Sequence, residues 1–322
     1  MKKKLRLKKR FKVILVTIII IVIGCIIGYN KYKEYKYHQT YEYKLLEHGY
    51  TTTEVKIIQS NWDKNEEIEF YLNNPLNKNY VLLLQEKYFL KKNYQQYIEY
   101  MKDNPKLSLD KVVRNINIHY NEEFYEDEYN TDTSLEELML VNKYYKLPSD
   151  YEPTDLVSIS TKYAWGDAGS KRIRKVVYDA FVEMWNQANE DGHYLMINSA
   201  YRPYKDQETI YNNYKAKQGQ KYADSIAAHP GYSEHQTGLC LDIFSKTNSN
   251  KQTFGDSETA AWLKNNSYKY GFILRYPEDS NINATGFTYE AWHYRYVGKE
   301  AAKYIYENNI IFEEYYAYFI EK

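Results

Sequence analysis

The sequence predicts a mixed α+β domain in the C-terminal half of this 322-residue chain. Apolar side chains recur with helical spacing over residues 171–188, whereas the short apolar stretches at 194–197 and 239–243 have the character of buried strands. These patterns do not follow a regular βαβ rhythm, so α+β describes them better than a doubly wound α/β fold.

The N-terminus combines a basic segment with an apolar run. The first twelve residues hold eight of the 43 basic side chains and none of the 43 acidic ones, so the rest of the chain has a net charge of −8. Residues 13–29 are uncharged and almost wholly apolar, near the lower limit of length for a transmembrane helix. Because the basic flank comes first, we expect residues 1–29 to be a single-pass signal anchor in the cell membrane, with a cytoplasmic N-terminus and an extracytoplasmic body.

Two other interpretations of this run stay open. The residues leading to Cys25 resemble a bacterial lipobox, which would make Cys25 the lipidated N-terminus of a lipoprotein, and a buried core segment is the remaining interpretation. A cleaved secretory signal is disfavoured because no small-x-small site follows the run. Beyond the N-terminus there is no basic groove or aromatic-basic motif, which argues against a nucleic-acid partner. No obligate protein partner is indicated.

Residues 30–140 are polar and contain no cluster of catalytic type. Helical spacing over 56–71 and 80–101 predicts an extracytoplasmic helical stalk. Two prolines within six residues then impose extended backbone and mark the lead-in to a new domain, which we place at 141–322.

Within this domain the first helix is expected to end at Gly192, in a left-handed C-terminal turn. Further helices are predicted at 204–218, 257–268 and 298–308, and an aromatic tail at 310–320 is expected to pack back on the body.

The strand predicted at 239–243 carries an unusual residue. Alternation places three aliphatic side chains on one face and Cys240 and Asp242 on the other. Aspartate is disfavoured in strands, so Asp242 needs a partner. A metal ion and an ion pair with an arginine such as Arg295 are equally good partners on this pattern alone.

Three residues have the chemistry of a zinc site. Zinc binds imidazole nitrogen and carboxylate oxygen, and a catalytic site keeps three protein ligands with a water in the fourth position. We expect His235, Asp242 and His293 to be the ligands, which leaves Glu290 as a general base. Arg202 is the cation best placed for a substrate carboxylate or a developing oxyanion.

One geometric requirement follows from this assignment. Glu290 and His293 are three residues apart, so a regular strand would send their side chains to opposite faces. We therefore predict a bulge or a bend near Trp292.

The motifs also occur in a known order. Ser199-Ala200-Tyr201-Arg202-Pro203 is followed by the segment 233–238 (SEHQTG), Asp242, the segment 270–277 (YGFILRYP) and the segment 290–298 (EAWHYRYVG). In this order they resemble the VanY-type D-alanyl-D-alanine carboxypeptidases over residues 140 to 310. The resemblance implies the fold of the hedgehog signalling domain and DD-peptidases, with a small antiparallel sheet flanked by helices. It also implies a zinc enzyme that removes the C-terminal D-alanine from peptidoglycan stem peptides.

Carried over position by position, the resemblance implies the same three zinc ligands and the same base. It adds a set of substrate-binding residues, namely Arg202, Gln207 and Ser233. The chain departs from the family pattern at Cys240, where a small residue is usual, and at Ala291, where proline is usual. Neither change removes a functional group.

Several alternatives stay open. The same chemistry would serve an L,D-carboxypeptidase acting on tetrapeptide stems, and the motifs do not separate the two reactions. A non-catalytic, zinc-stabilised wall-binding module is a further alternative, against which Glu290 argues. His229 is either a substitute ligand or a loop histidine. Cys240 is either a zinc ligand, a nucleophile or a small core thiol. Arg275 either binds substrate or holds the Tyr276-Pro277 turn.

Overall fold

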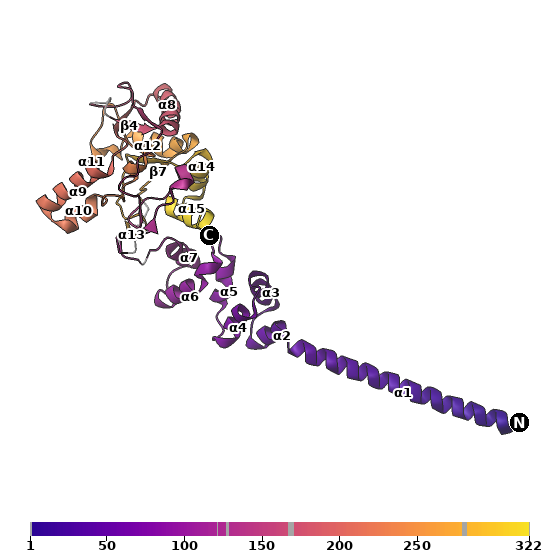
Figure 1. Cartoon of the computed structure of the whole chain (residues 1–322). Helices are drawn as coiled ribbons and strands as arrows, with labels where there is room; N and C mark the ends of the chain where they lie inside the picture. Colours follow the sequence, from indigo (N-terminus) through magenta and orange to yellow (C-terminus); the bar gives the residue numbers. More distant parts are fainter. Residues whose placement is uncertain (1, 121, 127–128, 167–170, 279–281, 322) are drawn as a thin grey trace. The chain divides into compact units, whose positions relative to one another are not determined.

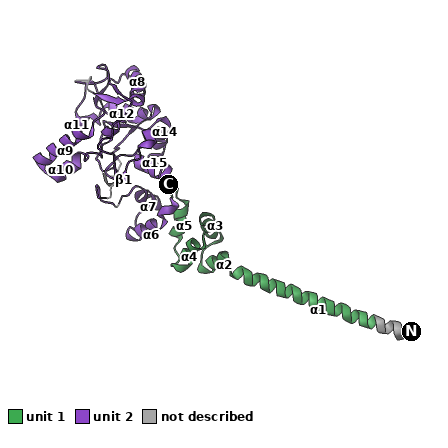
Figure 2. Cartoon of the chain, viewed as in Figure 1, with its two compact units in different colours: residues 1–89 green, residues 90–322 purple. Residues whose placement is uncertain are grey.

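The computed structural model describes residues 2–120, 122–126, 129–166, 171–278 and 282–321, with side chains from Lys8 onward except at 282–283 (Figure 1). The chain forms two compact units, Met1–Phe89 and Leu90–Lys322 (Figure 2). The expected boundary at residue 140 therefore falls inside the second unit. The physical reason is packing between α7 (Leu109–Asn117) and the C-terminal helix α15 (Phe312–Phe319), where Arg114 forms an ion pair with Glu314.

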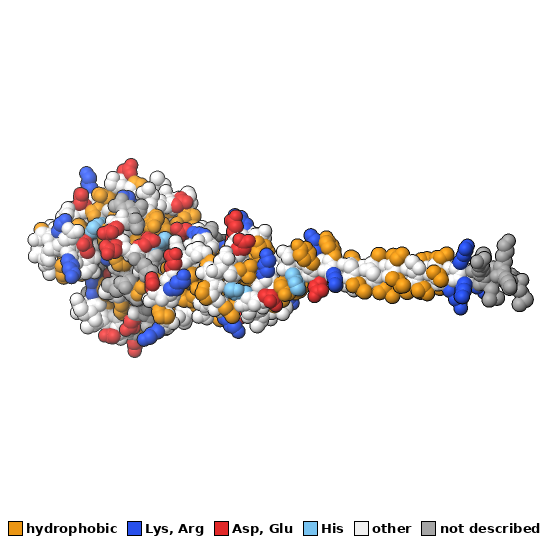
Figure 3. Space-filling model, turned by 90° about the horizontal axis from the view of Figure 1, so that it is seen from below, with side chains coloured by type: hydrophobic (Ala, Val, Ile, Leu, Met, Phe, Trp, Pro, Cys, Tyr) orange, Lys and Arg blue, Asp and Glu red, His pale blue; other side chains and the backbone are white. Residues whose placement is uncertain are grey.

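In the first unit, helix α1 (Lys2–His38) contains the predicted anchor. Among the described residues it is the one helix long and apolar enough to cross a membrane, with a mean hydropathy of 2.9 over its most apolar 18-residue window and no burial there. Figure 3 shows its apolar side chains as a continuous band with basic side chains at the N-terminal end. A signal sequence would have the same length and composition. The anchor therefore stays a prediction.

Five short helical segments complete the first unit: α2 (Tyr41–His48), α3 (Thr52–Asn61), α4 (Asn65–Asn73), α5 (Lys78–Leu82) and η1 (Leu83–Gln85). The single helix suggested by the spacing over 56–71 is wrong, because the chain is extended at Trp62 between α3 and α4. That break lets the buried indole of Trp62 donate its N–H to the hydroxyl of Tyr71 at 3.1 Å.

The second unit begins with η2 (Lys91–Asn93), α6 (Tyr94–Asp103) and α7. The helix expected over 80–101 is also interrupted, because the backbone N–H of Leu90 donates to the hydroxyl of Tyr97 instead of continuing a helix. Small elements follow: β1 (Tyr129–Asn130) parallel to β2 (Tyr145–Lys146), η3 (Thr133–Leu138), and β3 (Leu156–Ser158) antiparallel to β4 (Arg172–Arg174).

A four-stranded antiparallel sheet organises this unit. Its order is β5 (Leu195–Ser199), β6 (Cys240–Ser245), β8 (His293–Tyr296) and β7 (Phe272–Leu274). The remaining helices surround it: α8 (Lys175–Glu190), α9 (Tyr204–Gln218), α10 (Gln220–Ile226), η5 (Glu234–Thr237), α11 (Lys251–Phe254), α12 (Glu258–Asn266), η6 (Ser267–Tyr270), α13 (Ile282–Thr285), α14 (Lys299–Asn308) and α15 (Figure 1). The predicted class, helices on a small antiparallel sheet, is confirmed.

One face of the sheet forms the core with α8. The aliphatic residues Leu195, Ile197, Leu241 and Ile243 are fully buried there, and Val177, Phe181 and Met184 of α8 belong to the same cluster. Helix α8 starts later than predicted, because residues 172–174 extend to pair with β3, and it is followed by Gly192 with φ of 88°. The opposite face of the central strands is left free for polar side chains.

Candidate active site

The two central strands place an aspartate and a histidine side by side. Asp242 of β6 stands opposite His293 of β8, and the next pair on the same face is Cys240 opposite Arg295. The alternate residues, including Leu241 and its partner Tyr294, point into the core. The strand alternation predicted from the sequence is therefore confirmed, and it directs the carboxylate and the imidazole to one face.

His235 reaches the same face from the 3-10 turn η5. The turn ends at Gly238, whose φ is 65° and where an added Cβ would lie 3.1 Å from atoms of Arg174 and Leu156. Nδ1 of His235 donates to the carbonyl oxygen of Ala200 at 2.6 Å, so Nε2 carries the lone pair of the neutral ring. That nitrogen lies 3.6 Å from Oδ1 of Asp242. Burial lowers the pKa of His235 to about 3, which keeps the ring neutral.

His293 is held by a buried glutamate on its far side. Nε2 of His293 donates to Oε2 of Glu234 at 3.2 Å, and Nδ1 faces Oδ1 of Asp242 at 3.2 Å. With its proton on Nε2, the neutral ring has a lone pair on Nδ1, which points at another lone pair on the carboxylate. These two lone pairs repel each other unless a proton or a metal cation lies between Nδ1 of His293 and Oδ1 of Asp242. Burial opposes a charged ring, yet Cys240, Asp242 and Glu234 together raise the pKa of His293 well above its ordinary value.

Nε2 of His235, Oδ1 of Asp242 and Nδ1 of His293 could be the ligands of a tetrahedral metal ion. Ligands about 2.0–2.2 Å from a tetrahedral zinc ion lie roughly 3.3 Å from one another. Oδ1 of Asp242 is 3.6 Å from Nε2 of His235 and 3.2 Å from Nδ1 of His293. Donor atoms of His235, His293 and Cys240 also come together, within 4.8 Å of one another. Oδ1 of Asp242 therefore lies at a ligand-to-ligand distance from both imidazole nitrogens, which makes it a candidate third ligand.

Glu290 is brought to the site by a turn. The backbone N–H of His293 donates to the carbonyl oxygen of Glu290 at 3.2 Å, and β8 begins only at His293. The bend predicted near Trp292 is therefore confirmed. Oε2 of Glu290 lies 3.8 Å from Nδ1 of His293, and burial raises the pKa of this carboxyl. A carboxylate that is easily protonated next to three metal-type donors is suited to exchange protons with a reacting group.

All seven residues predicted for the site line one cleft of about 290 Å³: Arg202, Gln207, Ser233, His235, Asp242, Glu290 and His293. Arg202 is fixed there by donating to Oε1 of Gln207 at 2.7 Å and to Oγ of Ser199 at 3.2 Å. Gln207 is itself buried and donates to the carbonyl oxygen of Ala228 at 2.7 Å, so it supports Arg202 from behind.

The structure decides the alternatives for two other residues. Arg295 does not pair with Asp242, because its guanidinium donates to Glu234 at 2.9 Å and to the carbonyl oxygen of Met139 at 2.7 Å. His229 is a loop histidine, with Nε2 2.7 Å from Oδ1 of Asp224 and its ring stacked on Tyr125 at 3.7 Å. The ion-pair explanation of Asp242 through Arg295 is therefore wrong.

Comparison with known proteins gives the family. The profile of VanY D-alanyl-D-alanine carboxypeptidases matches residues 170–299, a range that contains all seven residues. The Bacillus subtilis protein YodJ is 43% identical over 182 residues, which make up 56% of this chain and 66% of YodJ. The bifunctional D-Ala-D-Ala dipeptidase and D-Ala-D-Ala carboxypeptidase VanXYC of Enterococcus gallinarum is 32% identical over 189 residues, 56% of this chain and 94% of that protein. This chain belongs to the VanY family.

A solved structure extends the likeness to the fold. The structure of the LdcB LD-carboxypeptidase is similar with a TM-score of 0.56 and 39% identity, over 61% of this chain and 92% of that chain. The resemblance stated from the motifs is therefore confirmed at the level of the family. The chain spans slightly less than two thirds of the length of YodJ.

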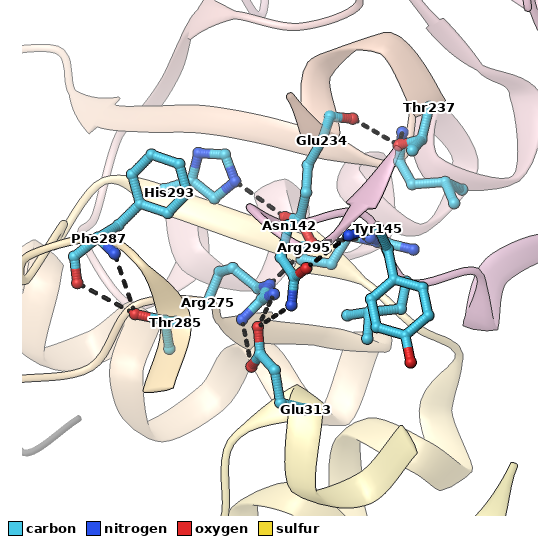
Figure 4. A network of polar contacts seen from close by, with 12 residues as sticks. Asn142, Tyr145, Glu234, Thr237, Arg275, Thr285, Phe287, His293, Arg295 and Glu313 are labelled. Atoms are coloured by element: carbon cyan, nitrogen blue, oxygen red, sulfur yellow. Dashed lines mark hydrogen bonds and ion pairs between the residues drawn. The ribbon is translucent and has the colours of Figure 1, made fainter. Parts of the chain in front are cut away.

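Two features of this VanY-family site were not assigned from the sequence. Glu234 joins His293 to two buried arginines, Arg275 and Arg295 (Figure 4). Arg275 is buried and is not among the residues that line the cleft, which argues against substrate binding, whereas its guanidinium lies 4.9 Å from the ring centroid of Tyr276, as holding the turn would require. The ring of Tyr276 also lies 5.0 Å from the ring of His293, which closes that side of the site. Glu234 sits inside the SEHQTG motif, but its arginine partners are 41 and 61 residues away, so no local pattern marked it.

Proposed function

We propose that this chain is a zinc-dependent D,D-carboxypeptidase that removes the C-terminal D-alanine from peptidoglycan stem peptides. The observation that carries the proposal is the position of Oδ1 of Asp242 between Nε2 of His235 and Nδ1 of His293, with Glu290 beside them. Two neutral imidazole nitrogens and a carboxylate are a donor set typical of catalytic zinc. When bound, zinc would polarise the scissile carbonyl and lower the pKa of a water toward about 7.

Glu290 supplies the proton transfers in this proposal. Its side chain is 23% exposed, so one edge is open to the cleft while the rest is buried. The carboxylate takes a proton from the attacking water and passes it to the amine that leaves as D-alanine. Because burial raises the pKa of this carboxyl, its protonated form is also accessible, as the second transfer requires.

Arg202 binds the substrate's terminal carboxylate in this proposal. A carboxypeptidase must recognise a free carboxylate next to the scissile bond, and a guanidinium does so with two parallel hydrogen bonds. The contacts to Gln207 and Ser199 fix the arginine before substrate arrives, which limits the entropy lost on binding. The backbone N–H of Arg202 donates to the carbonyl oxygen of His235 at 3.0 Å, so this cation is tied to the turn that bears a ligand.

The L,D-carboxypeptidase activity on tetrapeptide stems is the second candidate. It is favoured by the likeness to the LdcB LD-carboxypeptidase, whereas VanXYC is a D-Ala-D-Ala carboxypeptidase. Both reactions need the same donors, base and carboxylate-binding cation. They differ in the configuration of the residue before the scissile bond, which the walls of the cleft must distinguish.

A non-catalytic wall-binding module is less well supported. Structural zinc sites are closed by four protein ligands, whereas here three donors face an open cleft. Glu290 would also have no role in a module that only binds. We further propose that α1 anchors the enzyme in the cell membrane, with the first unit as spacer and the catalytic unit outside.

The proposal is tested with the purified full chain in detergent, loaded with zinc. Pentapeptide and tetrapeptide muropeptides are incubated with the enzyme, with and without a chelator, and the products are identified by mass. Loss of one alanine from the pentapeptide, abolished by the chelator and restored by zinc, is the expected result. Loss of alanine from the tetrapeptide alone would assign the L,D reaction. A zinc-loaded protein that cleaves neither peptide would rule out both reactions.

A further inference from the structure

We propose that Glu313 of the C-terminal helix α15 is a positioning residue for the metal ligand His293, acting through Arg275 and Glu234. The inference rests on the proposed metal site. It goes beyond it by assigning a role in metal affinity to a helix outside the residues that match the family profile. A continuous series of buried hydrogen bonds connects the helix to the ligand (Figure 4).

The series begins with a bidentate ion pair. Nη2 of Arg275 donates to Oε1 of Glu313 at 2.6 Å, and Nη1 donates to Oε2 at 2.9 Å. The amide of Asn142 donates to Oε1 of Glu313 at 3.2 Å, which fixes the carboxylate from a second side. The side chains of Arg275 and Glu313 are 0% and 4% exposed, so the geometry is held away from water.

The Nε–H group of Arg275 sets the orientation of Glu234. Nε of Arg275 donates to Oε1 of Glu234 at 2.8 Å, and Nη1 of Arg295 donates to the same oxygen at 2.9 Å. Two cations thus occupy Oε1, and Oε2 is left to accept from Nε2 of His293 at 3.2 Å. Outer partners of this kind fix the tautomer and the ring orientation of a ligating histidine.

The charges in this series balance in pairs. Two buried carboxylates, Glu234 and Glu313, face two buried guanidiniums, Arg275 and Arg295. Without the negative charge of Glu313, Arg275 loses one of its two carboxylate partners, and we expect its guanidinium to shift toward Oε2 of Glu234. That is the atom His293 uses. Competition for it would turn the imidazole away from Asp242, and the uncompensated positive charge would also oppose a metal cation.

A purely structural role for this ion pair is the competing explanation. Buried ion pairs contribute little net stability, although breaking one by removing a partner is costly. The next residue of α15 offers a control, because the buried carboxylate of Glu314 forms an ion pair with the partly exposed Arg114 of α7. Among the described residues, Glu314 accepts hydrogen bonds from Arg114 and from the backbone N–H of Ile311, and neither residue belongs to the series that ends at His293.

The experiment compares E313Q with E314Q in the full chain. The zinc dissociation constant of each protein is measured by competition with a chromophoric chelator, and the melting temperature of the metal-free protein is recorded separately. We expect E313Q to weaken zinc binding by roughly 10-fold, the lower end of the range for outer-shell partners. E314Q should bind zinc within two-fold of the unmodified protein, although both variants melt at lower temperature.

Equal zinc dissociation constants for E313Q and E314Q would overturn the inference. If E313Q is not recovered in folded form, E313D and E314D replace the pair. Each keeps its charge and shortens the side chain, so this comparison tests the placement of the carboxylate alone, and E313D is again expected to be the variant that weakens zinc binding. Zinc affinity is measured without substrate, so the two proposals fail separately. A protein that binds zinc in the expected order but cleaves no muropeptide would sink the proposed reaction alone.

Discussion

Asp242 and His293 face each other across β6 and β8, with Oδ1 of the aspartate 3.2 Å from Nδ1 of the histidine. Because the other ring nitrogen donates to Glu234, both facing atoms bear lone pairs when the ring is neutral. In the metal-free protein a proton on Nδ1 resolves this conflict, and a metal ion would take its place. Metal binding is therefore expected to displace a proton and to become weaker at acidic pH.

Replacing Asp242 by asparagine should remove most of the metal affinity. The amide keeps the shape of the side chain but loses the negative charge of the carboxylate, which attracts the divalent metal ion. We expect zinc affinity to fall at least 100-fold, measured by chelator competition. Cys240→Ala is the control, because the thiol is not among the proposed ligands despite its proximity. Loss of zinc in C240A with retention in D242N would reverse the assignment of the third ligand.

Glu290→Gln separates metal binding from catalysis. The amide cannot accept the proton of the attacking water, so kcat should fall by about 10²–10⁴-fold, as is typical when a general base is lost. The zinc content should stay at one per chain, because Glu290 is not a proposed ligand. Zinc content and turnover are measured on the same preparation. A zinc-loaded variant with nearly unchanged kcat would contradict the assigned role.

The fold was predictable from the sequence where patterns are local. The helix predicted at 204–218 matches α9, since periodicity and helix ends are encoded within one segment. The sequence could indicate that the predicted donors lie in one cleft, because His235 and Asp242 share one motif and Glu290 and His293 share another. The network behind them was not found, because Glu234 meets its arginines only after the sheet has formed. The packing of α7 against α15 could not be predicted either, because the two helices are distant in the sequence and meet only in the folded chain.

Gly238→Ala should weaken both stability and the site. An alanine at φ of 65° costs about 1–2 kcal/mol, and its Cβ would meet Arg174 and Leu156 at 3.1 Å. Because Gly238 joins η5 to β6, relief of this contact would shift His235 relative to Asp242. Gly192→Ala is the matched control, since φ there is 88° but nothing lies within 4 Å of the added Cβ. Both variants should melt lower, and only G238A should lose zinc affinity. If G238A bound zinc as tightly as the unmodified chain, the position of His235 would not depend on Gly238, which would contradict this prediction.

Cys25→Ser distinguishes the two kinds of membrane attachment. Cys25 is exposed on α1, and the helix continues past it to His38. If the apolar helix is the anchor, C25S should stay in the membrane fraction and keep its basic N-terminus, as detected by intact mass. Deletion of residues 13–29 should release the protein in either case. An unmutated chain whose intact mass shows that it begins at a lipid-modified Cys25 would instead indicate a lipoprotein.

Lys143 is expected to make stability depend on pH in the alkaline range. This side chain is 5% exposed, donates to the carbonyl oxygen of Asp224 at 2.8 Å, and lies over the ring of Phe287 at 4.7 Å. Burial lowers the pKa of Lys143 to about 8 from 10.5. Between those values the unfolded chain still holds a proton that the folded protein has released, so the free energy of unfolding rises with pH. A full shift of this size corresponds to about 3 kcal/mol.

Lys143→Met isolates this contribution, because methionine keeps the apolar stem and cannot titrate. We expect the Met variant to be more stable than the unmodified chain at pH 7 and its advantage to shrink by about 2–3 kcal/mol at pH 10. The difference between the two proteins is measured by urea unfolding at each pH, which cancels the titration of the many tyrosines. A difference that stays constant from pH 7 to pH 10 would mean that Lys143 keeps its charge in the folded protein, with the three rings beside it and the carbonyl of Asp224 compensating its burial.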